Sequence, residues 1–185
     1  MANVKISELA ELTKPAVDDK LVIVDASEAL DADKTKYITV DNLLSYETGV
    51  TNYTPTWTAM TTNPSLGNGS IAGRYYRIGN VVTAFINLTM GSTTTYGSGI
   101  WWFSMPFNFK VSPWANMPIG YGRYTDVDNQ HYGGPVLMGD YKKVGCMAFS
   151  AAYPAYLDWV ASNVPFTWGT GGVLQITFSY LANIS

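Results

Sequence analysis

Alternating apolar and polar positions predict a β-hairpin over residues 70–90. The runs 70-SIAGRYYRI-78 and 81-VVTAFINLTM-90 flank the dipeptide Gly79-Asn80. A two-residue Gly-Asn loop between alternating runs favours a hairpin, because such tight turns need a positive φ. We therefore expect the two runs to pair as antiparallel strands.

The two faces of this hairpin differ in polarity. One face sets large apolar residues opposite small or apolar ones, which predicts the side that packs on the core. On the other face Arg74 lies over Phe85, which predicts a solvent-side or interfacial pair. Counted from Ile78 opposite Val81, the core-side pairs are Ile71/Leu88, Gly73/Ile86, Tyr75/Ala84 and Arg77/Val82.

The rest of the chain past residue 50 has further short apolar runs between polar or glycine-rich stretches, and no run has sustained helical spacing. The run 100-IWWFSMPF-107 has aromatic residues on both faces, which predicts a central or covered strand. We expect a mainly β chain whose residues 53–185 form an antiparallel, jelly-roll-like β-sandwich of about seven or eight strands. Other strands are expected at 117–125, 135–139, 144–151 and 173–181, with the last one inside the sheet.

Residues 1–46 follow a different pattern and predict a small mixed segment. Apolar residues recur at helical spacing in 5-KISELAELT-13, and Pro15 ends that run because proline lacks an N–H. The runs 20-KLVIVDAS-27 and 35-TKYITVDNLLSY-46 predict two strands, the second followed by one helical turn. Such a segment is too small to bury its own core. It must dock on a partner or on the second domain, and a flexible charged leader is the alternative.

Composition changes at the same place as the pattern. Residues 1–46 hold 14 of the 25 charged groups but only two of the 26 aromatic residues. We therefore expect a docking segment at 1–46, a linker at 47–52 and a distal domain at 53–185.

Charge and cysteine content exclude several classes of protein. A net charge of −3 gives no indication of a nucleic-acid-binding surface. No stretch of eighteen apolar residues exists, so no membrane insertion is expected, and the N-terminus lacks the pattern of a secretory signal. One cysteine, Cys146, and one histidine, His131, cannot form an internal disulfide or a Cys/His zinc site. The cysteine content fits synthesis in a reducing cytosol.

Motifs for catalysis are missing. The stretch 67-GNGSIAG-73 opens a strand, and no lysine follows it in the pattern of a phosphate-binding loop. A Ser-His-Asp triad would need His131, the single histidine of the chain, and a nucleophilic serine, but the sequence contains no G-x-S-x-G motif. Hydrolysis of a surface glycan is the remaining enzymatic alternative, and past residue 50 its paired carboxylates would come from Asp126, Asp128, Asp140 and Asp158. We expect no enzyme and no cofactor. Asp126 and Asp128 are close enough in sequence to suggest a Ca²⁺ site, but 126-DVDNQHYGG-134 is not an EF-hand loop, so we expect a solvated turn and no metal site.

Aromatic residues beside the expected loops are the candidates for ligand or interface contacts. Exposed rings can stack on sugars or form a subunit interface, and packing in the core or in a trimer is the alternative for each of them. The candidates are Trp114, Tyr121, Tyr124, Tyr132, Tyr153, Tyr156 and Trp159.

The N-terminal segment resembles a module found at the start of many structural proteins of tailed bacteriophages. The resemblance rests on KISEL, LT, the D-D-x-L-x-I-V-D stretch from Asp18 to Asp25, TKxIT and NLL. It covers about a quarter of the chain and implies attachment of a distal domain to the virion. The residues expected to dock there are Ile6, Leu9, Leu12, Val22, Val24, Ile38, Val40, Leu43 and Leu44.

Residues 53–107 are similar to a recurring distal domain of phage minor tail and fibre proteins. The similarity lies in YTPTWT, TTNPSLGNGSIAGRYYRIGNVV and GSTTTYGSGIWWFSMPF, in that order. Together the two resemblances imply a non-enzymatic virion protein that projects a homotrimeric β knob, as a short tail fibre or receptor-binding protein. Its partners would be other virion proteins of the tail or capsid and a host surface glycan or protein. A capsid decoration or head fibre without a receptor is one alternative, and a stand-alone carbohydrate-binding module is another.

Overall fold

The computed structural model describes residues 16, 18–24, 35–40, 49–110, 117–140, 142–149 and 156–183. Contacts divide the chain into two compact units, residues 1–48 and 49–185. The second unit begins near the place where charge and aromatic content change along the sequence.

The first unit contains one antiparallel strand pair. β1 (Lys20–Val24) pairs with β2 (Thr35–Thr39) in the register that sets Lys20 opposite Thr39. Both strands lie where the sequence predicted them. The helical turn expected after the second strand and the helical run at 5–13 lie outside the described residues.

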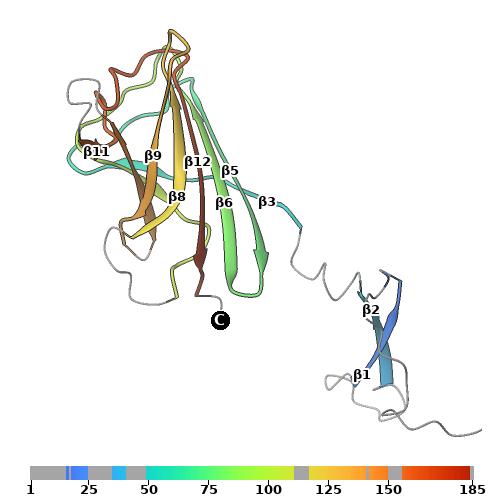
Figure 1. Cartoon of the computed structure of the whole chain (residues 1–185). Helices are drawn as coiled ribbons and strands as arrows, with labels where there is room; N and C mark the ends of the chain where they lie inside the picture. Colours follow the sequence, from blue (N-terminus) through green and yellow to red (C-terminus); the bar gives the residue numbers. More distant parts are fainter. Residues whose placement is uncertain are drawn as a thin grey trace, which may run out of the picture. The chain divides into compact units, whose positions relative to one another are not determined.

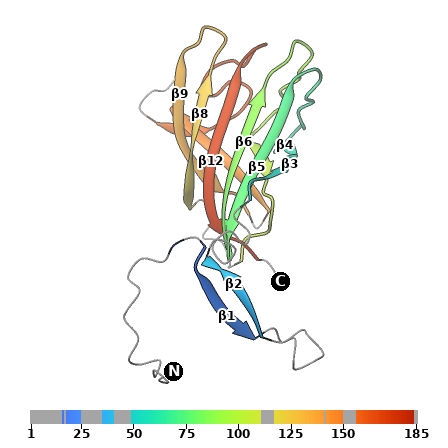
Figure 2. The same ribbon diagram turned by 90° about the vertical axis from the view of Figure 1, so that its right-hand side faces the viewer.

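The second unit is a ten-stranded antiparallel sheet in the order β3-β5-β6-β12-β8-β9-β10-β7-β4, with β11 paired to β10 (Figure 1). The strand β12 lies between β6 and β8, as predicted for the last strand, and Figure 2 shows these long strands side by side. Within the described parts of 49–183 no helix forms, so none there could span a membrane. The bounds are β3 Thr51–Tyr53, β4 Trp57–Ala59, β5 Ser70–Ile78, β6 Val81–Thr89, β7 Trp101–Ser104, β8 Pro118–Thr125, β9 His131–Met138, β10 Lys143–Phe149, β11 Leu157–Trp159 and β12 Val173–Leu181.

The β5–β6 hairpin confirms the predicted register residue by residue. Ile78 pairs with Val81, Arg74 with Phe85 and Ser70 with Thr89. Gly79 has a φ of 57° while Asn80 does not share a positive φ, which fits a turn of type II′ with glycine at its first central position. The predicted core-side residues of β6 are buried, and Phe85 is exposed on the other face.

The sheet curls because its two edge strands follow each other in the chain. β3 forms one edge and β4 the other, and only residues 54–56 join them. Four Cα–Cα steps span at most about 15 Å, so the two edges must approach each other. The backbone N–H of Thr56 donates to Oγ of Ser104 at 2.8 Å, which ties this connection to β7.

This arrangement corrects part of the predicted fold. The mainly β, antiparallel class is confirmed, but the described strands form one continuous curled sheet in place of two separate sandwich sheets. The physical reason lies in β9 and β10, whose hydrogen bonds link β8 on one side to β7 on the other. The curl brings the two halves of a single sheet face to face, so a core forms without a second sheet.

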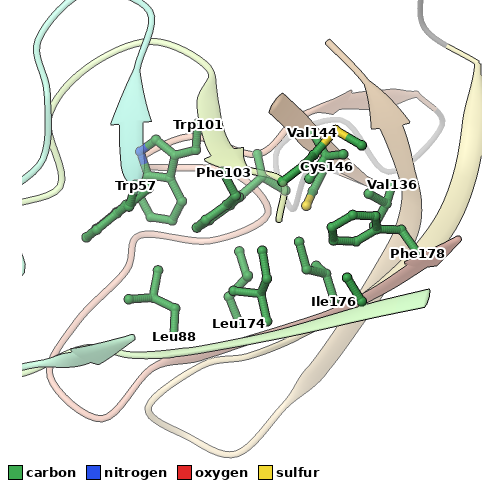
Figure 3. Close-up of a cluster of buried hydrophobic side chains, with 14 of the residues drawn as sticks. Trp57, Leu88, Trp101, Phe103, Val136, Val144, Cys146, Leu174, Ile176 and Phe178 are labelled. Atoms are coloured by element: carbon green, nitrogen blue, oxygen red, sulfur yellow. The ribbon is translucent and has the colours of Figure 1, made fainter. Parts of the chain in front are cut away.

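The core lies between these two halves. Figure 3 shows Trp101, Phe103 and Cys146 from one half opposite Leu88, Leu174 and Ile176 from the other. Trp101 and Phe103 are fully buried, and Trp101 packs edge-on against Trp57 with ring centroids 4.8 Å apart. The prediction that residues 100–107 form a central or covered strand is confirmed, because β7 lies between β10 and β4.

Candidate functional site

The outer face of β5, β6, β12 and β8 carries a surface depression lined by described residues. Alternation along each strand sends one set of side chains into the core and the next set outward. In β12 the even-numbered residues from Leu174 to Tyr180 are buried and the odd-numbered ones face away from the core. The same alternation in β6 and β8 exposes Phe85, Tyr121 and Arg123.

Strand register arranges these outward residues in two adjacent rows that cross all four strands. The first row is Arg74, Phe85, Thr177 and Tyr121, and the second is Ala72, Asn87, Gln175 and Arg123. Small side chains, Ala72 and Thr177, lie between or beside larger ones, and this leaves an open depression of about 580 Å³. That volume is within the range typical of small-molecule sites, roughly 300–1,000 Å³.

Both arginines of the depression carry charge into an otherwise neutral surface. Nη2 of Arg123 lies 3.2 Å from Nε2 and 3.3 Å from Nδ1 of His131, and the guanidinium donates to the ring nitrogen that carries no proton. Oγ1 of Thr125 lies 3.2 Å from Nδ1 of the same ring. The histidine thus orients the guanidinium at the end of the second row. Arg74 is exposed at the opposite end of the first row.

Polar and aromatic groups complete the surface between the arginines. Nε2 of Gln175 donates to Oδ1 of Asn87 at 3.0 Å, so the two amides are held in register. Phe85 is 45% exposed and Tyr121 is 59% exposed, so both rings offer free faces to a ligand. A side chain at Gly133 would collide with the Tyr121 hydroxyl, and glycine there leaves room for the Tyr121 ring to lie along the neighbouring strand.

The structure separates the aromatic candidates from the sequence into two groups. Tyr121 and Tyr156 are exposed, the latter 73%. Tyr124 is fully buried, and its hydroxyl donates to the carbonyl of Met147. Tyr124 is therefore a core residue and not a ligand-contacting one. The physical reason is that Tyr124 lies on the inward side of β8, over Gly122, three positions from the outward Tyr121. Trp114 and Tyr153 lie outside the described residues.

Two further candidates, Tyr132 and Trp159, are half-buried against other rings. Tyr132 packs on Phe166 at 5.1 Å, next to the core. Trp159 packs on Trp102 at 5.2 Å over Gly145, on the outer side of β10. Nζ of Lys143 lies 4.9 Å from the Trp102 ring. The rings of Trp102 and Trp159 therefore pack mainly on each other and on Lys143, which leaves little ring surface for a ligand.

The docking candidates of the first unit also differ in their exposure. Val22 is 76% exposed, and Ile38 and Val40 are half-buried. Val24 is the last residue of β1. Ile6, Leu9, Leu12, Leu43 and Leu44 lie outside the described residues.

Sequence reasoning found one part of the outer-face site and missed the rest. It paired Arg74 with Phe85 on the outer side of the hairpin, and the register confirms that pair. Arg123, Asn87 and Gln175 were not singled out. The alternation within 120-GYGRYT-125 was a usable signal for Arg123, because it places Tyr121 and Arg123 on one face.

Two carboxylates of the second unit, those of Asp126 and Asp140, are held in turns. Oδ1 of Asp126 accepts from the backbone N–H groups of Asp128 and Gln130, and Asp140 pairs with Lys143 at 3.3 Å. Among the residues that the structure describes, no group of three or more potential metal ligands occurs. The carboxylate of Asp158 accepts from its neighbouring backbone N–H at Trp159.

The described part of the second unit is thus an open, curled β sheet with an exposed aromatic and cationic outer face, and the sequence resembles phage tail-fibre proteins. That resemblance is confirmed by a curated relative. The chain is 31% identical over 119 residues to the Mu-like prophage FluMu defective tail fiber protein of Haemophilus influenzae strain Rd. The match covers 64% of this chain and 18% of the relative, so the chain spans less than a fifth of the length of that protein. No family model matches the chain, and no solved structure matches it significantly.

Proposed function

We propose that this chain is a non-enzymatic structural component of a tailed-phage virion that acts as a short tail fibre or receptor-binding protein. Its N-terminal segment, residues 1–46, attaches to another virion protein. The β domain, expected at 53–185, projects outward as a homotrimeric knob. The observation that carries the proposal is the similarity to a tail fiber protein over 119 residues.

Exposed apolar side chains in the first unit support attachment to a partner. Leu21, Val22 and Ile23 follow one another in β1 and are 46%, 76% and 40% exposed, so both faces of the strand carry apolar surface. A two-stranded pair alone is marginally stable in water. A docking partner that covers these residues would supply the missing hydrophobic burial.

The positions of the carboxylates support a role without catalysis. A glycosidase needs two carboxyl groups on either side of the scissile bond. In the described second unit, Asp126 and Asp140 lie in different turns, where each is engaged by neighbouring backbone N–H groups. Neither lines the depression on the outer face.

Competition for host cells tests the receptor role. Purified full-length chain is added to host cells before the phage that carries it, and the fraction of adsorbed phage is counted. We expect adsorption to fall with increasing protein, and the same chain unfolded by heat serves as the control. Unchanged adsorption at saturating protein would contradict the receptor role and favour a capsid decoration or head fibre. Immunogold labelling of heads against tails distinguishes these locations.

A further inference from the structure

We propose that the depression on the outer face of β5, β6, β12 and β8 binds an acidic oligosaccharide, with Arg74 and Arg123 recognising its anionic groups. The inference rests on the proposed receptor role and names the chemistry of the ligand. The anionic group is a carboxylate or a phosphate carried by the sugar, since a guanidinium binds both through paired N–H donors.

Charge complementarity is the first argument for an anionic ligand. Arg74 and Arg123 line the depression, and no carboxylate of the described residues lines it with them. The His131 ring that contacts Arg123 orients the guanidinium but carries no negative charge to neutralise it. A neutral face with two positive ends therefore favours a ligand that brings its own negative charge.

The groups between the arginines match the rest of a sugar. Phe85 and Tyr121 offer exposed rings on which the apolar face of a pyranose can stack. Asn87 and Gln175, joined by their own hydrogen bond, lie beside these rings and offer amide groups to sugar hydroxyls. Aromatic faces combined with amides are what a carbohydrate requires, and a simple inorganic anion would use neither.

Strand geometry sets the size of the ligand. Arg74 on β5 and Arg123 on β8 are three strand spacings apart and lie in adjacent rows. With strands about 4.8 Å apart and alternate residues about 6.8 Å apart, their Cα atoms are about 16 Å from each other. This Cα separation exceeds one sugar ring, so an oligosaccharide can contact both arginines at once.

The second unit of another copy of the chain fits this depression less well. To meet both arginines it would have to present two carboxylates from one surface. The second unit has four aspartates, and Asp126 and Asp140 are engaged in separate turns. An interface between two second units through the depression would leave two guanidinium groups buried without partners unless it brought carboxylates to both, and such burial is costly.

Calorimetric titration of the full-length chain tests the ligand class with matched pairs of probes. One pair is tetragalacturonate and its fully methyl-esterified form, in which each carboxylate is replaced by an uncharged methyl ester. The second pair is phosphorylated maltotriose and maltotriose. We expect at least one acidic probe to bind at least tenfold more tightly than its neutral match. The pair that shows the preference identifies a carboxylate or a phosphate as the anionic group.

Substitutions locate the site. The double variant R74Q/R123Q should lose the preference for the acidic probe, whereas K142Q, which removes an exposed positive charge in the β9–β10 turn, should keep it. Equal binding of acidic and neutral probes, no binding of any probe, or an unchanged preference in R74Q/R123Q would overturn the proposal. A lower molecular mass of R74Q/R123Q in light scattering would also overturn it, because the face would then be a subunit interface.

The adsorption assay separates this proposal from the proposed function. If wild type and R74Q/R123Q inhibit adsorption equally, the receptor role stands and the acidic-oligosaccharide site is wrong. If neither protein inhibits adsorption while the double variant loses the charge preference in calorimetry, the site stands and the receptor role is wrong.

Discussion

Cys146 shows how burial decides the chemistry of a single residue. The thiol is free and 1% exposed, beside Tyr124 in the core. Burial raises its pKa to about 12, and burial also raises the pKa of Tyr124 above its ordinary range. The thiolate, which is the nucleophilic form, is therefore scarce in the folded protein at neutral pH.

We predict that Cys146 resists a thiol reagent such as DTNB at pH 8 in the folded protein and reacts fully in guanidinium chloride.

The raised pKa of the Cys146 thiol also predicts that the stability of the fold depends on pH. Below pH 9, the ordinary pKa of this thiol, its contribution to folding is fully present. Between pH 9 and about 12 the unfolded chain loses the proton while the folded chain keeps it, so the free energy of unfolding falls.

Urea unfolding at pH 7, 9 and 10.5 measures this loss against the variant Cys146→Ala. The wild type should lose more stability than the variant between pH 9 and 10.5, by up to about 1.4 kcal/mol per pH unit. Equal losses in both proteins would show that the thiol does not ionise on unfolding in this range. Rapid labelling at pH 8 would show that the core opens readily.

At the scale of elements, the β5–β6 hairpin is the part that local sequence specifies most completely. Its register, its turn and its inward face all follow from alternation and one Gly-Asn dipeptide. The pair Gly73/Ile86 differs from the predicted pairing of a large residue with a small one, because Ile86 is not the residue that fills the space beside Gly73. A side chain at Gly73 would collide with the ring of Tyr53, so a ring from β3 occupies the space that this glycine leaves.

We predict that Gly79→Ala destabilises the protein by about 1–2 kcal/mol, because alanine at a φ of 57° is strained. Gly49→Ala is a matched control, since an added Cβ meets no atom within 4 Å at either position and only Gly79 has a positive φ. The control should change stability by no more than about 0.5 kcal/mol. Denaturant unfolding of both variants checks this, and equal effects would mean that turn conformation contributes nothing.

At the scale of the whole molecule, the outer face has an apolar end, away from the two arginines. Ile78, Val81 and Leu181 form one row across β5, β6 and β12. They are 61%, 48% and 47% exposed, on the same side of the sheet as the arginines. An exposed apolar row of this kind is typical of an interaction surface.

We predict that the full-length chain has the mass of a trimer in light scattering at micromolar concentration. Val81→Lys should shift it toward the monomer, because a charge in the apolar row would be buried without a partner. Leu157→Lys, at an apolar residue that is 41% exposed on β11, should remain trimeric. A monomeric wild type, both alone and with the docking protein, would contradict the predicted trimer. A Val81→Lys variant that stays trimeric would show that the interface lies elsewhere.

The sequence by itself determined the elements whose information is local. Period-two alternation and turn residues located the long strands, including 173–181 without error in its bounds. The strands β3, β4 and β11 were missed because three residues are too few to show a period. Sequence also separated the charged first segment from the aromatic remainder, since that difference is one of composition.

Only the tertiary structure decided how distant strands meet. Hydrogen bonds between β12 and both β6 and β8 bring Gln175 beside Asn87 and Arg123, residues that are far apart in the chain. No local pattern records that pairing, because backbone hydrogen bonds between strands carry no residue code of their own. The curl that replaces a two-sheet sandwich has the same origin. It follows from the short connection between β3 and β4, and only the strand order shows that these two strands are the edges of the sheet.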